Sequence, residues 1–325
     1  MTREIAFVAD ALPLHSEAHV AGARCRVATN SRALAQALRM WRRCDGVLPA
    51  GDFSMQVVVN QGKGGGRGDP HFRGLGHLVL ASFGEANLFV FDLARRNVMA
   101  TVSEEVASDQ LFWDRLMLPI AMGVLGAAVG VVPVHCACLA VGGAGLLIAG
   151  DSGAGKSTLS VALARSGFNF ISDDWTYLSQ TRGQLSANGM SVPAKLLPDC
   201  ERFFPFLEGY PIRPALNGEL AYELPPQELG SRVELSCEPR WFFFLERAKT
   251  ECRIDPVSPG EALQYVERSV ERLPPELADM AQRRSAIMAR IASLSCWKLT
   301  YGGSPEIAVN GLHEFVARQR IEVPA

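Results

Sequence analysis

The sequence predicts an α/β protein of two domains, a smaller N-terminal α/β domain over residues 1–102 and a larger domain over residues 103–325. Two observations carry this prediction. From about residue 103 onward, short apolar runs alternate with segments of helical periodicity, which is the pattern of an α/β layer architecture. A glycine-rich loop at residues 150–157 also lies between an apolar run and a helical segment, where α/β proteins place anion-binding loops.

The N-terminal domain is expected to consist mainly of strands and turns. Ser31–Arg43 has apolar residues at helical spacing after a serine that can cap its first turn. Residues 61–70 contain too much glycine for regular structure. They form either a plain surface loop or a mobile lid that brings Lys63 and Arg67 to phosphate. The expected strands are Ile5–Val8, Met55–Asn60, Leu78–Phe83 and Leu88–Asp92.

The larger domain is expected to begin with a helix over Ser103–Leu118, because Glu104 and Glu105 suit the positive end of its dipole. Prolines at the first helical position favour further helices downstream. The expected strands are 134–141, 146–149, 168–172 and 241–245, and the expected later helices are a loop-following helix to Arg165, Pro259–Leu273, Pro275–Leu294 and Pro305–Arg318.

One uncharged stretch, Leu116–Val134, approaches the length of about 20 residues that a helix needs to span a bilayer. It contains Pro119 and Pro133, is rich in small residues, and has no basic flank beyond Arg115. A buried helix followed by a core strand therefore explains the stretch better than a membrane span does. We expect no membrane partner.

Composition and charge exclude several classes of protein. A chain with 48% hydrophobic and 20% charged residues is typical of a globular protein. Its formal net charge of −2 gives no sign of the clustered basic surface that nucleic-acid binding needs. The 8 cysteines include no Cys-x-x-Cys pair, and the start of the chain shows no secretory signal. We therefore expect reduced, mostly buried thiols and a cytoplasmic location.

The strongest motif is the loop Gly150–Ser157, which matches G-x-x-x-x-G-K-[ST] in full. Its glycines let the backbone curl until successive N–H groups point inward, and the following helix adds the positive end of its dipole. The motif predicts that Lys156 reaches the β- and γ-phosphates and that Ser157 binds a metal ion, with ATP or another nucleoside phosphate and Mg²⁺ as cofactors. The expected nucleotide-binding residues here are Gly150, Asp151, Ser152, Gly153, Ala154, Gly155, Lys156, Ser157 and Thr158.

Three blocks of the larger domain form a set. They are Val134-His135 on the strand before the loop, the loop itself with Thr158, and Gly167–Asp174, which has the sequence Gly-Phe-Asn-Phe-Ile-Ser-Asp-Asp. Together they resemble the HPr kinase/phosphorylase superfamily, specifically its divergent HPr-kinase-like branch of serine kinases. His135 precedes the loop lysine, and Asp174 follows it, at the spacing expected for that family. The resemblance covers about Ser103 to Phe315.

This resemblance implies a P-loop kinase domain of the HPr-kinase/PEP-carboxykinase-like type, which transfers phosphate to a hydroxyl. By position it implies Asp174 as the general base, His135 as a neighbouring catalytic residue beside Lys156, and Ser157 as a metal ligand. General chemistry agrees, because phosphoryl transfer needs charge neutralisation and a carboxylate that accepts the hydroxyl proton. Asp173 is then available to hold the metal or its waters; the alternative for the acidic pair is a helix cap.

The sequence departs from the family in one segment. The family's Glu-x-Arg-Gly-x-Gly, which contributes a metal-binding carboxylate and phosphorylase activity, is missing, and residues 189–199 take its place. Asp199 falls near the expected spacing and is either the replacement metal ligand or a plain loop residue. Lys195 and Arg247 are either cations directed at nucleotide or acceptor phosphate, or surface residues. Neither phosphorylase activity nor HPr as substrate is supported without the missing segment.

We therefore expect a nucleotide- and Mg²⁺-dependent kinase that phosphorylates a hydroxyl of a protein, a peptide or a small molecule. Residues 200–235, rich in proline and aromatic side chains, are expected to cover the acceptor side. The family's tendency to assemble makes a homo-oligomer plausible. Two other functions fit the loop: a nucleotide-binding regulator that has lost transfer, and a hydrolytic P-loop ATPase.

Overall fold

The described part of the chain has the α/β class that the sequence predicts. The expected strand Ile5–Val8 and the glycine-rich residues 61–69, with Lys63 and Arg67, lie outside the described residues. The computed structural model describes residues 12–38, 49–60, 70–190, 192–215, 218–248, 252–270 and 278–319.

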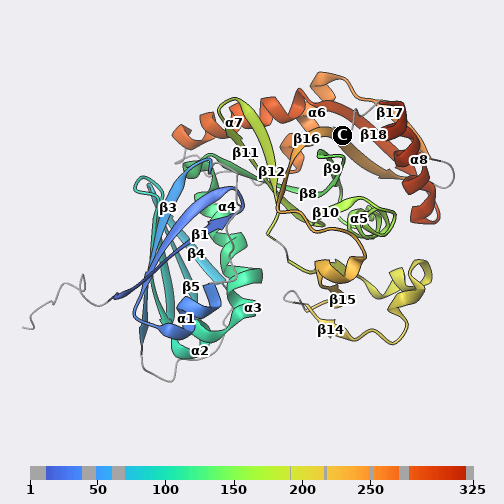
Figure 1. The fold of residues 1–325 in the computed structure, drawn as a ribbon. Coiled ribbons are helices and arrows are strands. Elements are labelled where there is room, and N and C mark those ends of the chain that lie inside the picture. The colour runs from blue at the N-terminus through green and yellow to red at the C-terminus, as the bar shows by residue number, and fades with distance from the viewer. Residues whose placement is uncertain are drawn as a thin grey trace, which may run out of the picture. The chain divides into compact units, whose positions relative to one another are not determined.

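The first of two compact units comprises Met1–Val131 and Arg272–Arg284 and is built on a seven-stranded sheet (Figure 1). Along β3 every second side chain is apolar and buried, as with Phe53, Met55 and Val57, which is the alternation that produces a strand. Strand β3 pairs in parallel with both of its neighbours. In order across the sheet, the strands are β1 (Leu14–Val20), β2 (Ala23–Thr29), β3 (Asp52–Asn60), β7 (Asn97–Ser103), β6 (Asn87–Asp92), β5 (Leu78–Phe83) and β4 (Pro70–Leu75).

The helices that follow this sheet belong to the same compact unit, which ends at Val131. Aromatic packing is the reason, because the ring of Phe112 lies 5.2 Å from that of Phe83, centroid to centroid. The buried indole of Trp113 donates a hydrogen bond to the carbonyl of Val106 at 2.9 Å. The helices of the unit are α1 (Arg32–Ala37), α2 (Glu104–Ser108), α3 (Gln110–Phe112), the π-helical segment η3 (Trp113–Met117) and α4 (Leu118–Val129).

The helical run Gln110–Val129 is long and apolar enough to cross a membrane by length and composition alone. However, 61% of its apolar window is buried inside the protein, which is equally typical of a core helix. Gly130 ends the run in the left-handed conformation, with φ 77°, and β8 (Val131–Val141) follows at once. The predicted buried helix followed by a core strand is confirmed.

The second unit comprises Val132–Glu271 and Ser285–Ala325 and contains an eight-stranded sheet. In it β9 lies between β8 and β16, and β9, β16 and β18 run parallel to one another. The carboxyl ends of these three strands therefore lie at the same edge of the sheet. The strands besides β8 are β9 (Ala144–Gly150), β10 (Asn169–Ser172), β11 (Trp175–Thr181), β12 (Gln184–Asn188), β16 (Ser236–Arg247), β17 (Arg253–Pro256) and β18 (Ser295–Tyr301).

Strand β16 supplies side chains to two hydrophobic cores, one on each face of the sheet. Trp241, Phe243 and Leu245 pack into the core that includes α5 (Lys156–Arg165) and α8 (Pro305–Arg318). Phe242 and Phe244 pack into the opposite core, with α6 (Pro259–Arg268) and α7 (Ala278–Ala292). A continuous apolar run is what a strand buried on both faces requires.

The proline-started helices are confirmed where the structure describes them. Helix α8 has the predicted bounds, and α6 starts at the predicted Pro259. At that point Ser258 and Glu261 form a capping box, which satisfies N–H groups of the first helical turn. Helix α6 ends at Arg268, before the predicted Leu273.

A three-stranded sheet and short 3₁₀ segments lie between β12 and β16. This segment packs on α5, and its Phe204 and Leu207 are buried in the same core as that helix. Its elements are β13 (Ala194–Leu196), η4 (Pro198–Phe203), η5 (Pro205–Leu207), β14 (Ile212–Pro214), β15 (Leu220–Leu224) and η6 (Pro226–Leu229).

Candidate functional site

The glycine-rich loop connects the end of β9 to the first turn of α5, as its sequence requires. Gly153 and Gly155 adopt the left-handed region, with φ 78° and 97°, which side chains with a Cβ rarely enter. Gly155 also caps α5, so the amides of the first turn are directed at the loop. The loop thus combines curled backbone donors with the positive end of a helix, the two elements of a phosphate site.

Gly150 must be glycine for lack of space and not for its φ angle, because its backbone packs directly against β16. A Cβ at this position would lie 2.8 Å from the carbonyl oxygen of Leu245, a backbone atom held in the sheet. We expect Gly150→Ala to lower the free energy of unfolding by about 1–3 kcal/mol through overpacking. Gly260→Ala is the matched control in the same unit, since a Cβ there meets nothing within 4 Å and lies in helix α6. It should be neutral or stabilising, and equal denaturant midpoints for the two variants would contradict the clash.

Lys156 is buried, and its ammonium group lies inside the loop. Nζ donates to the carbonyls of Gly150 and Asp151, at 2.9 and 3.2 Å. Burial lowers the pKa of Lys156 below its ordinary value, while the charge of Asp174 opposes that shift. The loop therefore holds a positive charge at its centre, where a polyphosphate would lie.

Asp173 is fully enclosed, with 2% of its surface exposed, and lies next to the loop serine. Its carboxylate accepts hydrogen bonds from the backbone N–H of Lys195, at 3.0 Å, and from the hydroxyl of Ser157. Burial raises the pKa of Asp173 to about 7, the neighbouring Asp174 adds to the rise, and the two donors oppose it. A buried carboxylate beside a loop hydroxyl offers the oxygen ligands that Mg²⁺ accepts together with substrate phosphates.

Asp174 and His135 form a pair at the edge of the loop. Nε2 of His135 lies 2.8 Å from Oδ1 of Asp174, whose side chain is 55% exposed. The backbone N–H of His135 donates to the carbonyl of Ser269 at 2.7 Å, and the imidazole stacks on the ring of Trp175 with centroids 5.3 Å apart. The carboxylate is therefore oriented by the histidine and still accessible from solvent.

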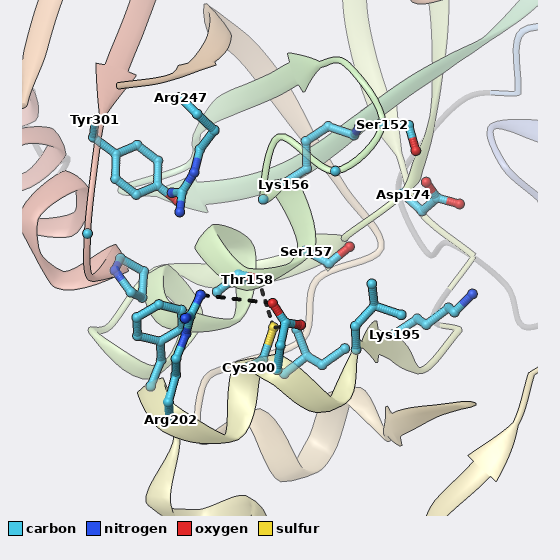
Figure 2. Close-up of a pocket in the computed structure, with 18 of the residues that line it drawn as sticks. Ser152, Lys156, Ser157, Thr158, Asp174, Lys195, Cys200, Arg202, Arg247 and Tyr301 are labelled. Atoms are coloured by element: carbon cyan, nitrogen blue, oxygen red, sulfur yellow. Dashed lines mark hydrogen bonds and ion pairs between the residues drawn. The ribbon is translucent and has the colours of Figure 1, made fainter. Parts of the chain in front are cut away.

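His135, Asp174 and Lys156 line one cavity of about 240 Å³, whereas the buried Asp173 is not among its lining residues. Figure 2 shows Lys156 and Ser157 in its middle, Asp174 and Lys195 towards one side, and Arg247 and Tyr301 towards the other. Of the nucleotide-binding residues expected from the loop, Ser152, Gly153, Gly155, Lys156, Ser157 and Thr158 line this cavity. Arg247 lines it from the carboxyl end of β16.

The remaining expected metal ligand, Asp199, also lines the cavity, but its contacts are different. Its carboxylate lies 3.9 Å from Nη2 of Arg202, and the side chain is 69% exposed. Within the described ranges, no group of three or more His, Cys, Asp or Glu side chains is arranged to hold a metal ion. Ser157 and Asp173 are thus brought together, whereas Asp199 is not placed beside them by any described contact. Lys195 pairs with Glu219, at 2.6 Å.

Sequence reasoning expected residues 200–235 to cover the acceptor side but did not assign Cys200 or Arg202 to the nucleotide loop or the metal. Cys200, Arg202 and Phe203 come from η4, and the thiol of Cys200 lies 3.1 Å from the hydroxyl of Thr158. Tyr301 comes from β18, a strand that we did not predict although the apolar residues Trp297, Leu299 and Tyr301 recur at every second position. That alternation was the available signal.

Comparisons with known proteins address the same region. The family model described as the HPr serine kinase C-terminal domain matches residues 129–197. This range contains His135, the whole phosphate loop and the pair Asp173-Asp174. No curated protein matches the chain.

Among solved structures, the HPr(Ser) kinase/phosphatase from Coxiella burnetii is similar at 15% identity, covering 57% of this chain and 92% of that one. Its TM-score of 0.32 is too low to carry an argument about the fold. The family match, over a range that holds every block of the resemblance, confirms the relationship expected from the sequence. Residues 129–197 of the chain are therefore similar to the C-terminal domain of HPr serine kinases.

Proposed function

We propose that the protein is a nucleotide- and Mg²⁺-dependent kinase that transfers the γ-phosphoryl group to a hydroxyl of a protein, peptide or small-molecule acceptor. One observation carries the proposal: a histidine-oriented carboxylate, Asp174, lines the same cavity as a complete phosphate loop. Phosphoryl transfer needs these two parts, a site that neutralises the phosphate chain and a base directed at the nucleophile.

In the proposed reaction, the acceptor oxygen forms a bond to the γ-phosphorus while the bond from that phosphorus to the β,γ-bridging oxygen breaks. The hydroxyl proton passes to the carboxylate of Asp174. His135, bonded to one oxygen of that carboxylate, leaves the other to accept the proton. Lys156 offsets charge on the phosphate chain, and the nucleoside diphosphate leaves with the electron pair.

Ser157 and Asp173 are the residues that fit Mg²⁺, on the evidence of a buried carboxylate already bonded to the loop hydroxyl. A bound magnesium ion would neutralise phosphate charge and fix the orientation of the phosphate oxygens. Asp199 lines the cavity and is a further candidate ligand only if it turns away from Arg202.

The decisive experiment incubates the purified protein with γ-labelled ATP and Mg²⁺, together with serine-containing proteins, peptides and small hydroxyl compounds. We expect label on an acceptor. Rapid release of inorganic phosphate without any acceptor would instead indicate an ATPase. Tight nucleotide binding with neither transfer nor hydrolysis would indicate a regulator that has lost catalysis, a reading favoured by the missing glutamate segment. Either of these results would contradict the proposal.

A further inference from the structure

Tyr301 has a buried hydroxyl group without a partner. The residue lies at the carboxyl end of β18 with 0% of its surface exposed. Its hydroxyl oxygen is one of two buried side-chain polar atoms in the described residues that make no hydrogen bond. Leaving such a group unpaired is costly, and native structures seldom do so without a reason.

The nearest polar side chain cannot accept the hydroxyl proton. Arg247 lies over the tyrosine ring, with Cζ 4.6 Å from the ring centroid, and a guanidinium group only donates. Burial raises the pKa of Tyr301 above its ordinary value, so the hydroxyl keeps its proton at neutral pH. Arg247 itself has no carboxylate within ion-pair distance among the residues that the structure describes. The guanidinium can donate to the tyrosine oxygen, and its charge and hydrogen bond oppose the rise in the pKa of Tyr301, but the tyrosine proton itself has no acceptor.

Both donors face the phosphate loop. A Cβ built on Gly155 would lie 3.4 Å from the hydroxyl oxygen of Tyr301 and 3.8 Å from Nη1 of Arg247. Strand register explains the arrangement, because Arg247 lies opposite Tyr301 in the parallel pair of β16 and β18. In Figure 2 the two side chains lie on the side of the loop that is away from Asp174.

We propose that Tyr301 and Arg247 form an anion subsite, in which the tyrosine hydroxyl and the guanidinium bind a phosphate oxygen of the nucleotide on the side away from Asp174. This inference rests on the proposed nucleotide function and adds Tyr301 as a binding residue. Phosphate is the fitting ligand because it brings acceptors and negative charge to a place that has two donors and a positive charge. An oxygen of the nucleotide's sugar or base would also accept a hydrogen bond, but it carries no negative charge to match the guanidinium, so phosphate is the better fit.

Tyr301→Phe tests the subsite, because it removes the hydroxyl and keeps the ring under Arg247. We expect the Kd for Mg·ADP and for Mg·tripolyphosphate, measured by calorimetry, to rise by about 10- to 100-fold, the range for a hydrogen bond to a charged group. The Tm of the ligand-free variant should equal or exceed that of the wild type, since an unpaired buried polar atom has been removed.

Tyr222→Phe is the matched control. Tyr222 is also buried, but its hydroxyl already donates to Glu201, at 3.1 Å. This variant should lose Tm and keep its affinity for both ligands. If Tyr301→Phe also lowers the Tm and leaves both affinities unchanged, the hydroxyl of Tyr301 has a structural role and the proposed anion subsite is refuted. A loss of affinity for ADP but not for tripolyphosphate would overturn the phosphate assignment. Equal affinities in wild type and Tyr301→Phe would refute only this inference, whereas a wild type that binds neither ligand would refute the proposed function as well.

Discussion

Asp174→Asn should reduce phosphoryl transfer by about a hundredfold to ten-thousandfold, the usual contribution of a positioned general base. Asparagine keeps the shape of the side chain and can still accept from Nε2 of His135, which lies 2.8 Å from the carboxylate. It cannot take the acceptor proton. The loss should appear in kcat, measured as initial rates with γ-labelled ATP, while the Kd for nucleotide stays the same or falls because a negative charge near the phosphates is gone.

Two further variants serve as controls for Asp174→Asn. Asp255→Asn changes an exposed carboxylate of β17 that pairs with Arg253, and it should transfer at the wild-type rate. His135→Gln keeps a donor near Asp174 but loses the stacked imidazole, so a smaller loss than that of Asp174→Asn is expected. Undiminished transfer by Asp174→Asn would assign the base to another group.

Asp173 should make the protein less stable as the pH rises from about 4 to about 7. Its pKa is raised from 3.8 to about 7 by burial, so in this window the unfolded chain has released a proton that the folded protein still holds. Stability falls with pH wherever the folded state binds more protons, and it levels off above the folded pKa. A shift of this size corresponds to at most about 4 kcal/mol.

The measurement compares urea unfolding of the wild type and Asp173→Asn at several pH values, because the contributions of all other groups cancel in the difference. Asparagine keeps an oxygen for the N–H of Lys195 but cannot ionise. The variant should therefore gain stability relative to the wild type as the pH rises towards 7, with little further gain above it. A difference that is constant from pH 4 to pH 8 would show that the carboxyl group has an ordinary pKa in the fold.

The parts of the site that follow from local sequence were predictable. The loop, its preceding strand and its following helix are encoded within residues 144–165, and the acidic pair follows directly after β10. The contribution of Tyr301 was not, because it depends on the pairing of β16 with β18, which are far apart in the chain. Nor could the sequence show that Asp199 lies beside Arg202 while Asp173 lies beside Ser157.

The fold shows the same limit. Strands β5 and β16 were evident because their apolar residues have a strong pattern, and β5 has its predicted bounds. Strand β4 was missed because it is exposed along its length and has no apolar alternation to detect. The packing of Phe112 against Phe83 could not be inferred either, because helical periodicity alone does not show which strand a helix covers.

Three parallel strands bring the loop, Arg247 and Tyr301 to one edge of the sheet by backbone pairing alone. The connection from the second of these strands to the third contains β17 and then helices α6 and α7. Their outward surfaces can therefore change in sequence without moving any of the three. A substitution on those exposed helical faces should therefore leave the geometry of the loop edge unchanged.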